Sequence, residues 1–335
     1  MTRVAVIGTG VMGRNHVRVL RELGEVDLVG VADANLDAAA QVAAIHGTRG
    51  YGSLQELFER EHPDAIIVAA PTKNHHAIVM EALAAGCHVL VEKPIAATLK
   101  EADELVARAA SAKRVLAVGH IERYNPAVIE LKRRLDEGQL GRVFQLNARR
   151  LGPFPQRIRD VGVVVDLATH DLDVMRYLTG SEIVRVYAET RREVHTTRED
   201  LVSGLLRFED GSVGVLQINW LTPTKIRELV VTGERGMFRA DYLTQDLFFH
   251  ENAAAADYNW QQITMLRGVS EGSMVLYAIQ KREPLRSELE AFLRAVAGDS
   301  SRIVSGEDGR EALRLALALV ESGAEGRVVT TIGQS

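Results

Sequence analysis

Cysteine is nearly absent from this sequence, since the chain of 335 residues holds only Cys87. A single thiol excludes an internal disulfide and cannot supply a cysteine-rich metal site. Its surroundings, GCHVLVEKP, have the pattern of an apolar strand. We therefore expect a buried thiol rather than a reactive nucleophile.

Long apolar runs and an excess of positive charge are also missing. No apolar segment approaches the roughly 18 residues of a membrane-spanning helix. The N-terminus lacks a signal-peptide pattern, because Arg3 is followed at once by a strand and a glycine-rich turn. The formal net charge of -5 argues against general affinity for nucleic acid or anionic membranes. We therefore expect a cytoplasmic protein with neither kind of partner.

The length predicts two folded domains, because 335 residues exceed the roughly 150 that one hydrophobic core usually serves. Apolar residues make up 46% and charged residues 25%, which is ordinary for a globular protein. We place one domain over residues 1–122 and a second over residues 123–335.

The first of these domains alternates β-branched runs with helical patterns. Strands are expected at residues 4–8, 27–32, 65–70, 88–92 and 114–119. Two of the helices between them carry capping-box signals, Ser53 with Glu56 and Thr98 with Glu101. Such repeated β-α units predict an α/β domain with a doubly wound parallel sheet, the Rossmann arrangement, which binds ligands at the carboxyl ends of its strands.

Beyond a helix near residues 125–136, strand-like runs follow one another directly. They are RVFQLNARR, EIVRVYAET, LVSGLLRFEDGSVGVLQINW and IRELVVTGERGMFRADY. Glycine-containing turns within the last two indicate hairpins. The second domain is therefore expected to be α+β, with a large, open, mostly antiparallel sheet. Helices are expected at residues 285–297 and 307–322, the second ending at Gly323 in a C-cap position.

The stretch VAVIGTGVMG breaks a good strand with glycines at positions 8, 10 and 13. The spacing Gly8-x-Gly10-x-x-Gly13 between a strand and a helix is typical of a dinucleotide-binding loop. Asp33, in GVADAN near the end of the second strand, is suited to hydrogen-bond a ribose hydroxyl. Its carboxylate would repel a 2'-phosphate, and no arginine follows it closely. The sequence therefore predicts NAD rather than NADP.

Two further segments hold residues suited to acid–base chemistry. Lys93 follows a strand within Glu-Lys-Pro, where a desolvated lysine can lose its proton or orient a substrate hydroxyl, although the same tripeptide also occurs in surface turns. Asp166 and His170 are four residues apart, on one face of a helix that Gly180 ends, so the carboxylate can orient the imidazole. An exposed pair without function is the alternative reading.

Positive charge gathers in one segment of this acidic chain. Arg149, Arg150, Arg157 and Arg159 follow one another within eleven residues. A guanidinium group can bind two oxygens of a phosphate at once, so the segment is a candidate for holding the diphosphate of a nucleotide sugar. A solvated strand end and loop is the alternative.

Taken together, these segments resemble the Gfo/Idh/MocA family of sugar and cyclitol oxidoreductases along nearly the whole chain. The matching segments are GTGVMGRNH, PTKNHHAIVMEALAAGCHVLVEKP, GHIERYNPAV, EGQLGRV, DLATHDLD, PLRSELEAFLRAV and GEDGREAL. The pairing of EKP with a later D-x-x-x-H is the most specific part. The run from NARRLGPFPQRIRD to LATHDLDVMRYLTG is similar to one branch in particular, whose members oxidise carbon 3 of UDP-N-acetylglucosamine and related UDP-sugars.

The resemblance, with the motifs above, implies roles for particular residues. The catalytic residues are Lys93, Asp166 and His170, with His170 the proton acceptor. The NAD-binding residues are Gly8, Gly10, Val11, Met12, Gly13, Asp33, Thr72, His75, Glu92, Lys93 and Arg123. The substrate-binding residues are Lys93, Tyr124, Arg149, Arg150, Arg157, Asp166 and His170. Asp171 and Asp173 beside His170 could suggest a metal site, but the hydride chemistry of the family needs none, so we expect no metal.

The expected function is therefore NAD-dependent oxidation of a sugar secondary hydroxyl, with C3 of UDP-N-acetylglucosamine as the substrate position and a 3-keto sugar nucleotide as product. An inositol or free-sugar dehydrogenase of the same family, and a non-catalytic NAD-binding regulator, remain as alternatives. The resemblance also implies a homodimer or homotetramer that covers the open sheet.

Overall fold

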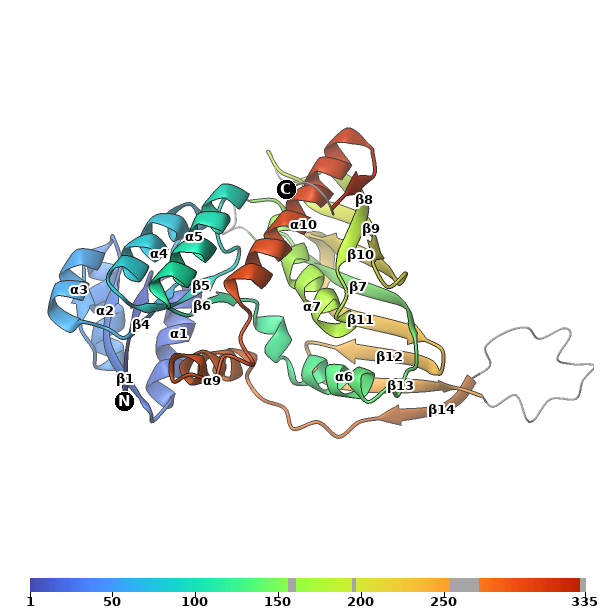
Figure 1. Cartoon of the computed structure of the whole chain (residues 1–335), viewed down its shortest axis with the longest axis horizontal. Helices are drawn as coiled ribbons and strands as arrows, with labels where there is room; N and C mark the ends of the chain where they lie inside the picture. The colour runs from blue at the N-terminus through green and yellow to red at the C-terminus, as the bar shows by residue number, and fades with distance from the viewer. Residues whose placement is uncertain (156–160, 195–196, 254–270, 332–335) are drawn as a thin grey trace, which may run out of the picture. The chain divides into compact units, whose positions relative to one another are not determined.

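The computed structural model describes residues 1–155, 161–194, 197–253 and 271–331 (Figure 1). The chain divides into two compact units. The first unit comprises Met1–Tyr124 and Arg282–Arg314, and the second comprises Asn125–Lys281 and Leu315–Ser335. Each unit has its own sheet and its own hydrophobic core.

The sheet of the first unit has six strands in the order β3-β2-β1-β4-β5-β6, and every neighbouring pair is parallel. Its strands are β1 (Thr2–Ile7), β2 (Val26–Ala32), β3 (Gly50–Tyr51), β4 (Ala65–Val68), β5 (His88–Glu92) and β6 (Leu116–Gly119). All four residues of β4 are buried, as are all four of β6, which is typical of a parallel sheet covered on both faces. The predicted doubly wound sheet is confirmed.

Helices connect and cover these strands. They are α1 (Val11–Glu22), α2 (Leu36–His46), α3 (Leu54–Glu61), α4 (His75–Ala84), α5 (Leu99–Ala112) and α9 (Pro284–Val296), with 3-10 turns η1 (Thr72–Asn74) and η2 (Ile121–Tyr124). Ser53 caps α3 by accepting a hydrogen bond from the Glu56 amide, and Thr98 and Glu101 form the expected capping box of α5. Helix α9 comes from far along the chain and packs against α1 and η2 through Leu285, Leu289 and Phe292.

The sheet of the second unit has nine strands in the order β14-β13-β12-β11-β7-β10-β9-β8-β15. Among the described strands of this second sheet, only the β7–β10 pair is parallel, so the predicted mostly antiparallel sheet is confirmed. The strands are β7 (Val143–Pro153), β8 (Ile183–Arg191), β9 (Leu201–Phe208), β10 (Val213–Asn219), β11 (Leu221–Gly233), β12 (Gly236–Asp241), β13 (Asp246–Asn252), β14 (Glu271–Leu276) and β15 (Val329–Thr330). Gly211 and Gly236, both at positive φ, lie at the two predicted hairpin turns.

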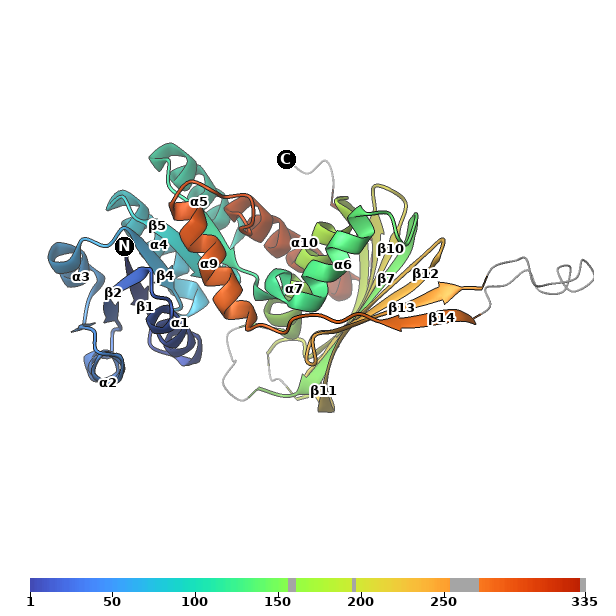
Figure 2. The same cartoon turned by 90° about the horizontal axis from the view of Figure 1, so that it is seen from below.

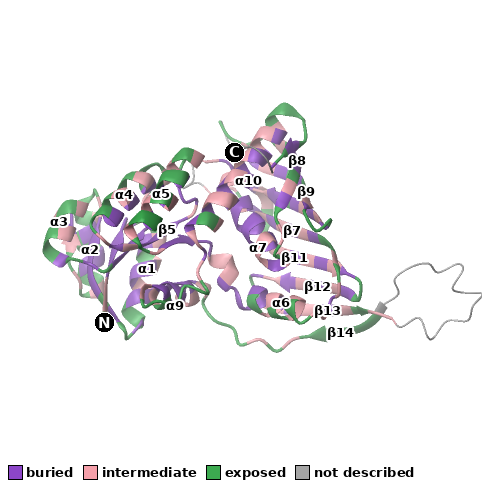
Figure 3. Cartoon of the chain, viewed as in Figure 1, coloured by how far each residue is buried: buried purple, intermediate pink, exposed green. Residues whose placement is uncertain are grey.

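One face of this sheet carries the helices α6 (Pro126–Asp136), α7 (Thr169–Thr179) and the later part of α10 (Gly306–Glu325), as Figure 2 shows. Strand β7 shows how the sequence produces this arrangement, because its buried residues alternate with less buried ones: Leu146, Ala148 and Arg150 are buried, whereas Asn147 and Arg149 are not. The buried residues, purple in Figure 3, form a core between sheet and helices.

The predicted end of the last helix is wrong. Helix α10 runs through Gly323 to Glu325, and Gly326, with φ of 64°, takes the left-handed conformation instead. Gly323 is a glycine for another reason: a Cβ there would lie 2.5 Å from the Cγ2 of Thr190 on β8. The residue thus allows helix and sheet to approach closely.

Among the described residues, no helix is long and apolar enough to cross a membrane.

Candidate active site

The glycine loop joins β1 to α1, and two of its glycines are required by the packing of the chain itself. Gly8 has φ of 96°, and a Cβ there would lie 2.6 Å from the carbonyl oxygen of Ala69. A Cβ at Gly13 would lie 1.9 Å from the carbonyl oxygen of Gly8. Gly10 differs, because a Cβ there would meet nothing within 4 Å. The space beside Gly10 is therefore open to a ligand that approaches the backbone.

Helix α1 begins at this open point. Its N-cap is Gly10, which offers no side-chain acceptor to the first amides of the helix. Val11 and Met12 follow as the first helical residues, and Val11 is largely exposed. An uncapped helix start beside a glycine loop suits a phosphate group, because the free N–H groups and the helix dipole both favour negative charge.

Asp33 directly follows β2, facing the loop. Its Oδ2 accepts hydrogen bonds from the Thr9 amide at 2.7 Å and the Thr9 hydroxyl at 2.8 Å, and its Oδ1 accepts one from the Asn35 amide at 2.9 Å. Partial burial raises the pKa of Asp33, but the hydrogen bonds from Asn35 and Thr9 outweigh it, so the pKa lies below the ordinary value. The carboxylate is therefore ionised and fixed in place at neutral pH.

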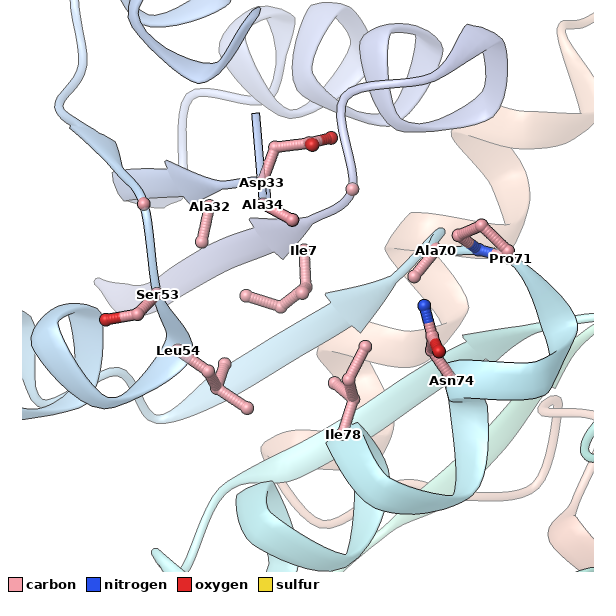
Figure 4. A pocket seen from close by; sticks show the side chains of 12 residues that line it. Ile7, Ala32, Asp33, Ala34, Ser53, Leu54, Ala70, Pro71, Asn74 and Ile78 are labelled. Atoms are coloured by element: carbon pink, nitrogen blue, oxygen red, sulfur yellow. The ribbon is translucent and has the colours of Figure 1, made fainter. Parts of the chain in front are cut away.

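A cleft of about 240 Å³ opens between the ends of β1, β2 and β4 (Figure 4). Its lining combines apolar side chains with the single carboxylate of Asp33: Ile7, Gly8, Ala32, Asp33, Ala34, Gly52, Ser53, Leu54, Ala70, Pro71, Asn74 and Ile78. An apolar slot with one acidic group at the carboxyl ends of parallel strands fits the adenosine part of NAD. Thr72, expected to line the cofactor, begins the turn after Pro71 and is partly exposed.

Several lining residues were not anticipated from the sequence. Leu54 and Ile78 lie on helices α3 and α4, whose helical periodicity marks them only as apolar positions. Asn74 precedes His75 and contributes a polar group to the cleft. The position of each strand end in the sheet order, rather than any local motif, brings them together.

Lys93 follows the last residue of β5, and the Lys93–Pro94 peptide bond is cis. The side chain of Glu92 points into the first unit, where its Oε1 lies 2.8 Å from Nε2 of His16 on α1. Both of these side chains are buried. His75, at the start of α4, is also buried, and its Nδ1 lies 2.9 Å from the carbonyl oxygen of Pro94. The backbone on both sides of Lys93 is thus tied to the interior.

Asp166 and His170 lie in the second unit, at the start of α7. Asp166 belongs to a short π-helical segment, Val164–Ala168, that precedes the α-helix containing His170, and Gly180 ends that helix as predicted. Both side chains are largely buried, with 8% and 7% exposure. Such π-helical segments often occur at functional sites.

Glu199 holds the start of this segment in place, which the sequence did not reveal. Its carbonyl oxygen accepts the Val163 amide at 2.9 Å, and its Oε1 accepts the Val164 amide at 3.3 Å. A Cβ at Gly162 would lie 2.0 Å from the Glu199 carboxylate, so a larger residue there would displace that side chain from its present position. Residues distant in sequence therefore set the path that carries Asp166.

The two described arginines of the expected phosphate cluster, Arg149 and Arg150, lie on opposite faces of β7. Arg150 is 3% exposed and gives hydrogen bonds to Asp171 from Nε at 2.6 Å and from Nη2 at 3.1 Å. Arg149 lies on the opposite face of β7 and pairs with Glu228 at 3.5 Å. Arg157 and Arg159 lie outside the described residues.

The remaining candidates lie at the end of the first unit's main segment. Arg123 forms an ion pair with Asp308 at 3.2 Å, and Tyr124 is buried.

Cys87 is buried, and burial raises the pKa of its thiol to about 11, so the expected inert thiol is supported. Within the described ranges, no group of three or more His, Cys, Asp or Glu side chains is arranged to hold a metal ion.

The fold and the glycine loop define a class: a dinucleotide-binding α/β unit joined to an α+β unit with a large sheet. Residues 2–120 match the oxidoreductase family with the NAD-binding Rossmann fold, and residues 128–239 match the Gfo/Idh/MocA C-terminal domain. The chain belongs to the Gfo/Idh/MocA family and is an NAD-binding oxidoreductase of this sugar and polyol dehydrogenase family.

Particular relatives span nearly the whole chain. The UDP-N-acetylglucosamine 3-dehydrogenase of Acidithiobacillus ferrooxidans is 32% identical over 315 residues, covering 94% of this chain and 95% of its own. Its solved structure has a TM-score of 0.83, covering 96% of this chain and 97% of its own. The myo-inositol 2-dehydrogenase of Thermotoga maritima is 26% identical over 340 residues and covers 98% of both chains.

Proposed function

We propose that this protein oxidises the C3 hydroxyl of UDP-N-acetylglucosamine to a ketone, with NAD as the hydride acceptor. The observation that carries the proposal is the 32% identity to a UDP-N-acetylglucosamine 3-dehydrogenase over 94% of the chain. It is supported by the branch resemblance of the segment that ends in LATHDLDVMRYLTG.

The residues of the first unit suit NAD. Gly8, Gly10 and Gly13 shape the loop that receives the diphosphate at the start of α1. Asp33 is placed to accept hydrogen bonds from the ribose hydroxyls of the adenosine and to repel a 2'-phosphate, because it is ionised and fixed. When bound, NAD supplies the nicotinamide carbon that takes the hydride from the sugar.

The oxidation also requires that the hydroxyl lose its proton as the hydride leaves. We assign His170 as the acceptor of that proton, with Asp166 on the preceding turn as its neighbour. Lys93 is assigned to hydrogen-bond and orient the reacting hydroxyl. No metal takes part in this proposal, because hydride transfer to NAD needs only a positioned alcohol and a base.

A second candidate is oxidation of an inositol or a free sugar, and one structural observation favours keeping it. The sequence argument for a nucleotide sugar used the arginines as a diphosphate site, but Arg150 is bound to Asp171 and Arg149 pairs with Glu228 on the other face. These two guanidinium groups therefore add little support for a diphosphate. The inositol dehydrogenase of Thermotoga maritima also matches the full chain.

We further propose that the enzyme is a homo-oligomer in the cytoplasm. The second unit exposes large apolar residues on strands of its sheet, which include Phe144, Leu205, Met274, Val275 and Leu276. Exposed apolar side chains on a sheet and on its edge strand are stabilised when another copy covers them. A chain with one buried thiol suits a reducing compartment.

A comparative assay separates the two candidate functions. The protein is incubated with NAD and with UDP-N-acetylglucosamine, the corresponding C6 uronate, free N-acetylglucosamine or myo-inositol, and NADH formation is followed. We expect the highest kcat/KM for a UDP-sugar. A higher kcat/KM for myo-inositol would replace the proposal with the second candidate, and no NADH from any of them would favour a non-catalytic NAD-binding protein.

A further inference from the structure

Each residue next to Lys93 is anchored by a buried histidine, Glu92 through its side chain and Pro94 through its backbone carbonyl. Before it, the Oε1 of Glu92 lies 2.8 Å from Nε2 of His16, which is 0% exposed. After it, the carbonyl oxygen of Pro94 lies 2.9 Å from Nδ1 of His75, which is 1% exposed. Lys93 itself is only partly buried. A partly buried lysine therefore lies between two residues that are held from within.

The two histidines belong to the elements that form the proposed NAD site. His16 lies on α1, the helix that starts at Gly10. His75 is the first residue of α4, and its Nε2 lies 2.9 Å from the carbonyl oxygen of Ala70, which lines the cleft beside Asp33. Each histidine therefore connects one wall of the NAD site to the residues next to Lys93.

The chemistry of each contact fits a fixed hydrogen bond. Burial raises the pKa of Glu92, but its partner His16 and the charge of Lys93 outweigh it, so the pKa lies below the ordinary value and the carboxylate is ionised. Its Oε2 lies beside Gly119, where a Cβ would come to 3.0 Å, so the glycine leaves room for the carboxylate. Burial lowers the pKa of His75, although its contacts with the carbonyls of Ala70 and Pro94 favour the protonated form; a neutral imidazole has one N–H, which one of these two carbonyl oxygens accepts.

Other ionisable groups surround this segment. From α9, Glu288 is buried and interacts electrostatically with Glu92. His120 follows Gly119 at the end of β6 and is buried, and Arg123 on the next turn is paired with Asp308. The contacts to Oε1 of Glu92 and to the carbonyl of Pro94 that fix this segment from within are those of His16 and His75.

We propose that His16 and His75 are positioning residues that hold Lys93 from both sides and thereby couple its position to the two elements that bind NAD. The inference rests on the proposed function, because that function assigns Lys93 to orient the reacting hydroxyl. Small displacements of a reacting group are costly, since about 1 Å can lower the rate about 100-fold.

The first test is kinetic and uses matched variants. His16→Leu removes the partner of Glu92, whereas His16→Gln keeps an N–H at the position of Nε2; His75→Ala and His75→Asn form the same comparison for Nδ1. We expect kcat to fall about 10- to 100-fold in the Leu and Ala variants and to recover largely in the Gln and Asn variants. The loss of NAD affinity, measured by binding, should be smaller than the loss of kcat.

A control comes from the same strand. His88 lies at the start of β5 and accepts a hydrogen bond from the Val115 amide at 3.0 Å, at the end remote from Lys93. His88→Leu should therefore leave kcat near the wild-type value. An equal loss of kcat in His88→Leu would mean that any damaged histidine of this unit lowers turnover, and would overturn the proposal.

A double-mutant cycle separates positioning from general stability. If His16 acts through Lys93, then adding His16→Leu to Lys93→Met should lower kcat no further than Lys93→Met alone. If the two losses multiply, His16 acts by another route and the proposal is wrong. The same comparison applies to His75→Ala.

The second test does not depend on the substrate. An amine-reactive ester modifies accessible lysines, and mass spectrometry gives the rate at Lys93 relative to Lys100, whose side chain is 87% exposed. We expect this relative rate to change in His16→Leu and His75→Ala but not in His16→Gln or His88→Leu. An unchanged rate in all four variants would overturn the positioning role, even if no UDP-sugar is oxidised and the proposed function itself fails.

Discussion

The guanidinium group of Arg150 donates two hydrogen bonds to the carboxylate of Asp171, and both side chains are only 3% exposed. Strand β7 thereby holds the first turn of α7, on which His170 lies directly before Asp171. This pair gives Arg150 a structural partner in place of the expected phosphate.

Replacing Arg150 should therefore affect stability more than substrate binding. Arg150→Ala leaves the buried carboxylate of Asp171 without its ion-pair partner, which typically costs about 3–5 kcal/mol in the free energy of unfolding. Chemical denaturation measures this loss. Arg149→Ala is the matched control, because its pair with Glu228 is partly exposed and is worth about 0–1 kcal/mol. Equal effects of the two substitutions would contradict this interpretation.

Asp33 should determine the choice between NAD and NADP. The double substitution Asp33→Ser with Ala34→Arg removes the negative charge at the end of β2 and supplies a partner for a 2'-phosphate. We expect the ratio of kcat/KM for NADP to that for NAD to rise by at least about tenfold, which corresponds to about 1.4 kcal/mol. A wild-type protein that already uses both cofactors equally would show that Asp33 has no such role.

The local part of this site follows from the sequence, because its determinants are close together along the chain. The spacing of Gly8, Gly10 and Gly13 and the acid at the end of the next strand describe one β-α-β unit. The alternation of side chains in a strand also places Arg149 and Arg150 on opposite faces. The pattern RVFQLNARR alone therefore predicts that the two arginines point away from each other.

The rest depends on contacts between residues far apart in sequence. Nothing near His16 indicates that it contacts Glu92, which is 76 residues away. Glu199 shapes the turn that carries Asp166 from a separate loop, and Gly323 allows α10 to approach Thr190. Such contacts follow from the tertiary arrangement and leave no periodic signal in the sequence.

Glu288 should make the stability of the protein depend on pH. Its side chain is 1% exposed, and neither carboxylate oxygen has a hydrogen-bond partner among the described residues. Burial, followed by the charge of Glu92, raises its pKa well above the ordinary 4.5. The folded state thus keeps a proton that the unfolded chain releases. The contribution of the protonated Glu288 to the stability of the folded state is fully present below pH 4.5 and is lost as pH rises toward the pKa of Glu288 in the folded state.

The variant Glu288→Gln has no titrating carboxyl at this position, so its comparison with wild type isolates the pH-dependent contribution of Glu288 to stability. Thermal unfolding of both proteins between about pH 4 and pH 8 should show wild type losing stability relative to the variant as pH rises, by at most about 1.4 kcal/mol per pH unit. A difference in Tm that stays constant across this range would show that Glu288 has no raised pKa.

Turnover should depend on Lys93 and His170. Lys93→Met removes the hydrogen-bonding group at nearly constant length, and His170→Asn keeps some hydrogen bonding but cannot accept the proton. Each should lower kcat by at least about 100-fold, the effect expected for a missing acid–base group. Binding of NAD should persist, because neither residue belongs to the glycine loop. A wild-type kcat in Lys93→Met would remove Lys93 from the mechanism.

The central claim is that hydride leaves C3 of a UDP-sugar and reaches NAD. The most direct measurement uses UDP-N-acetylglucosamine with deuterium at C3, followed by mass spectrometry of the NADH formed. The account predicts NADH that carries the deuterium, formed in equal amount with a 3-keto sugar nucleotide. Formation of NADH that carries no deuterium would contradict the central claim. Failure to form any NADH while NAD binds normally would contradict it as well.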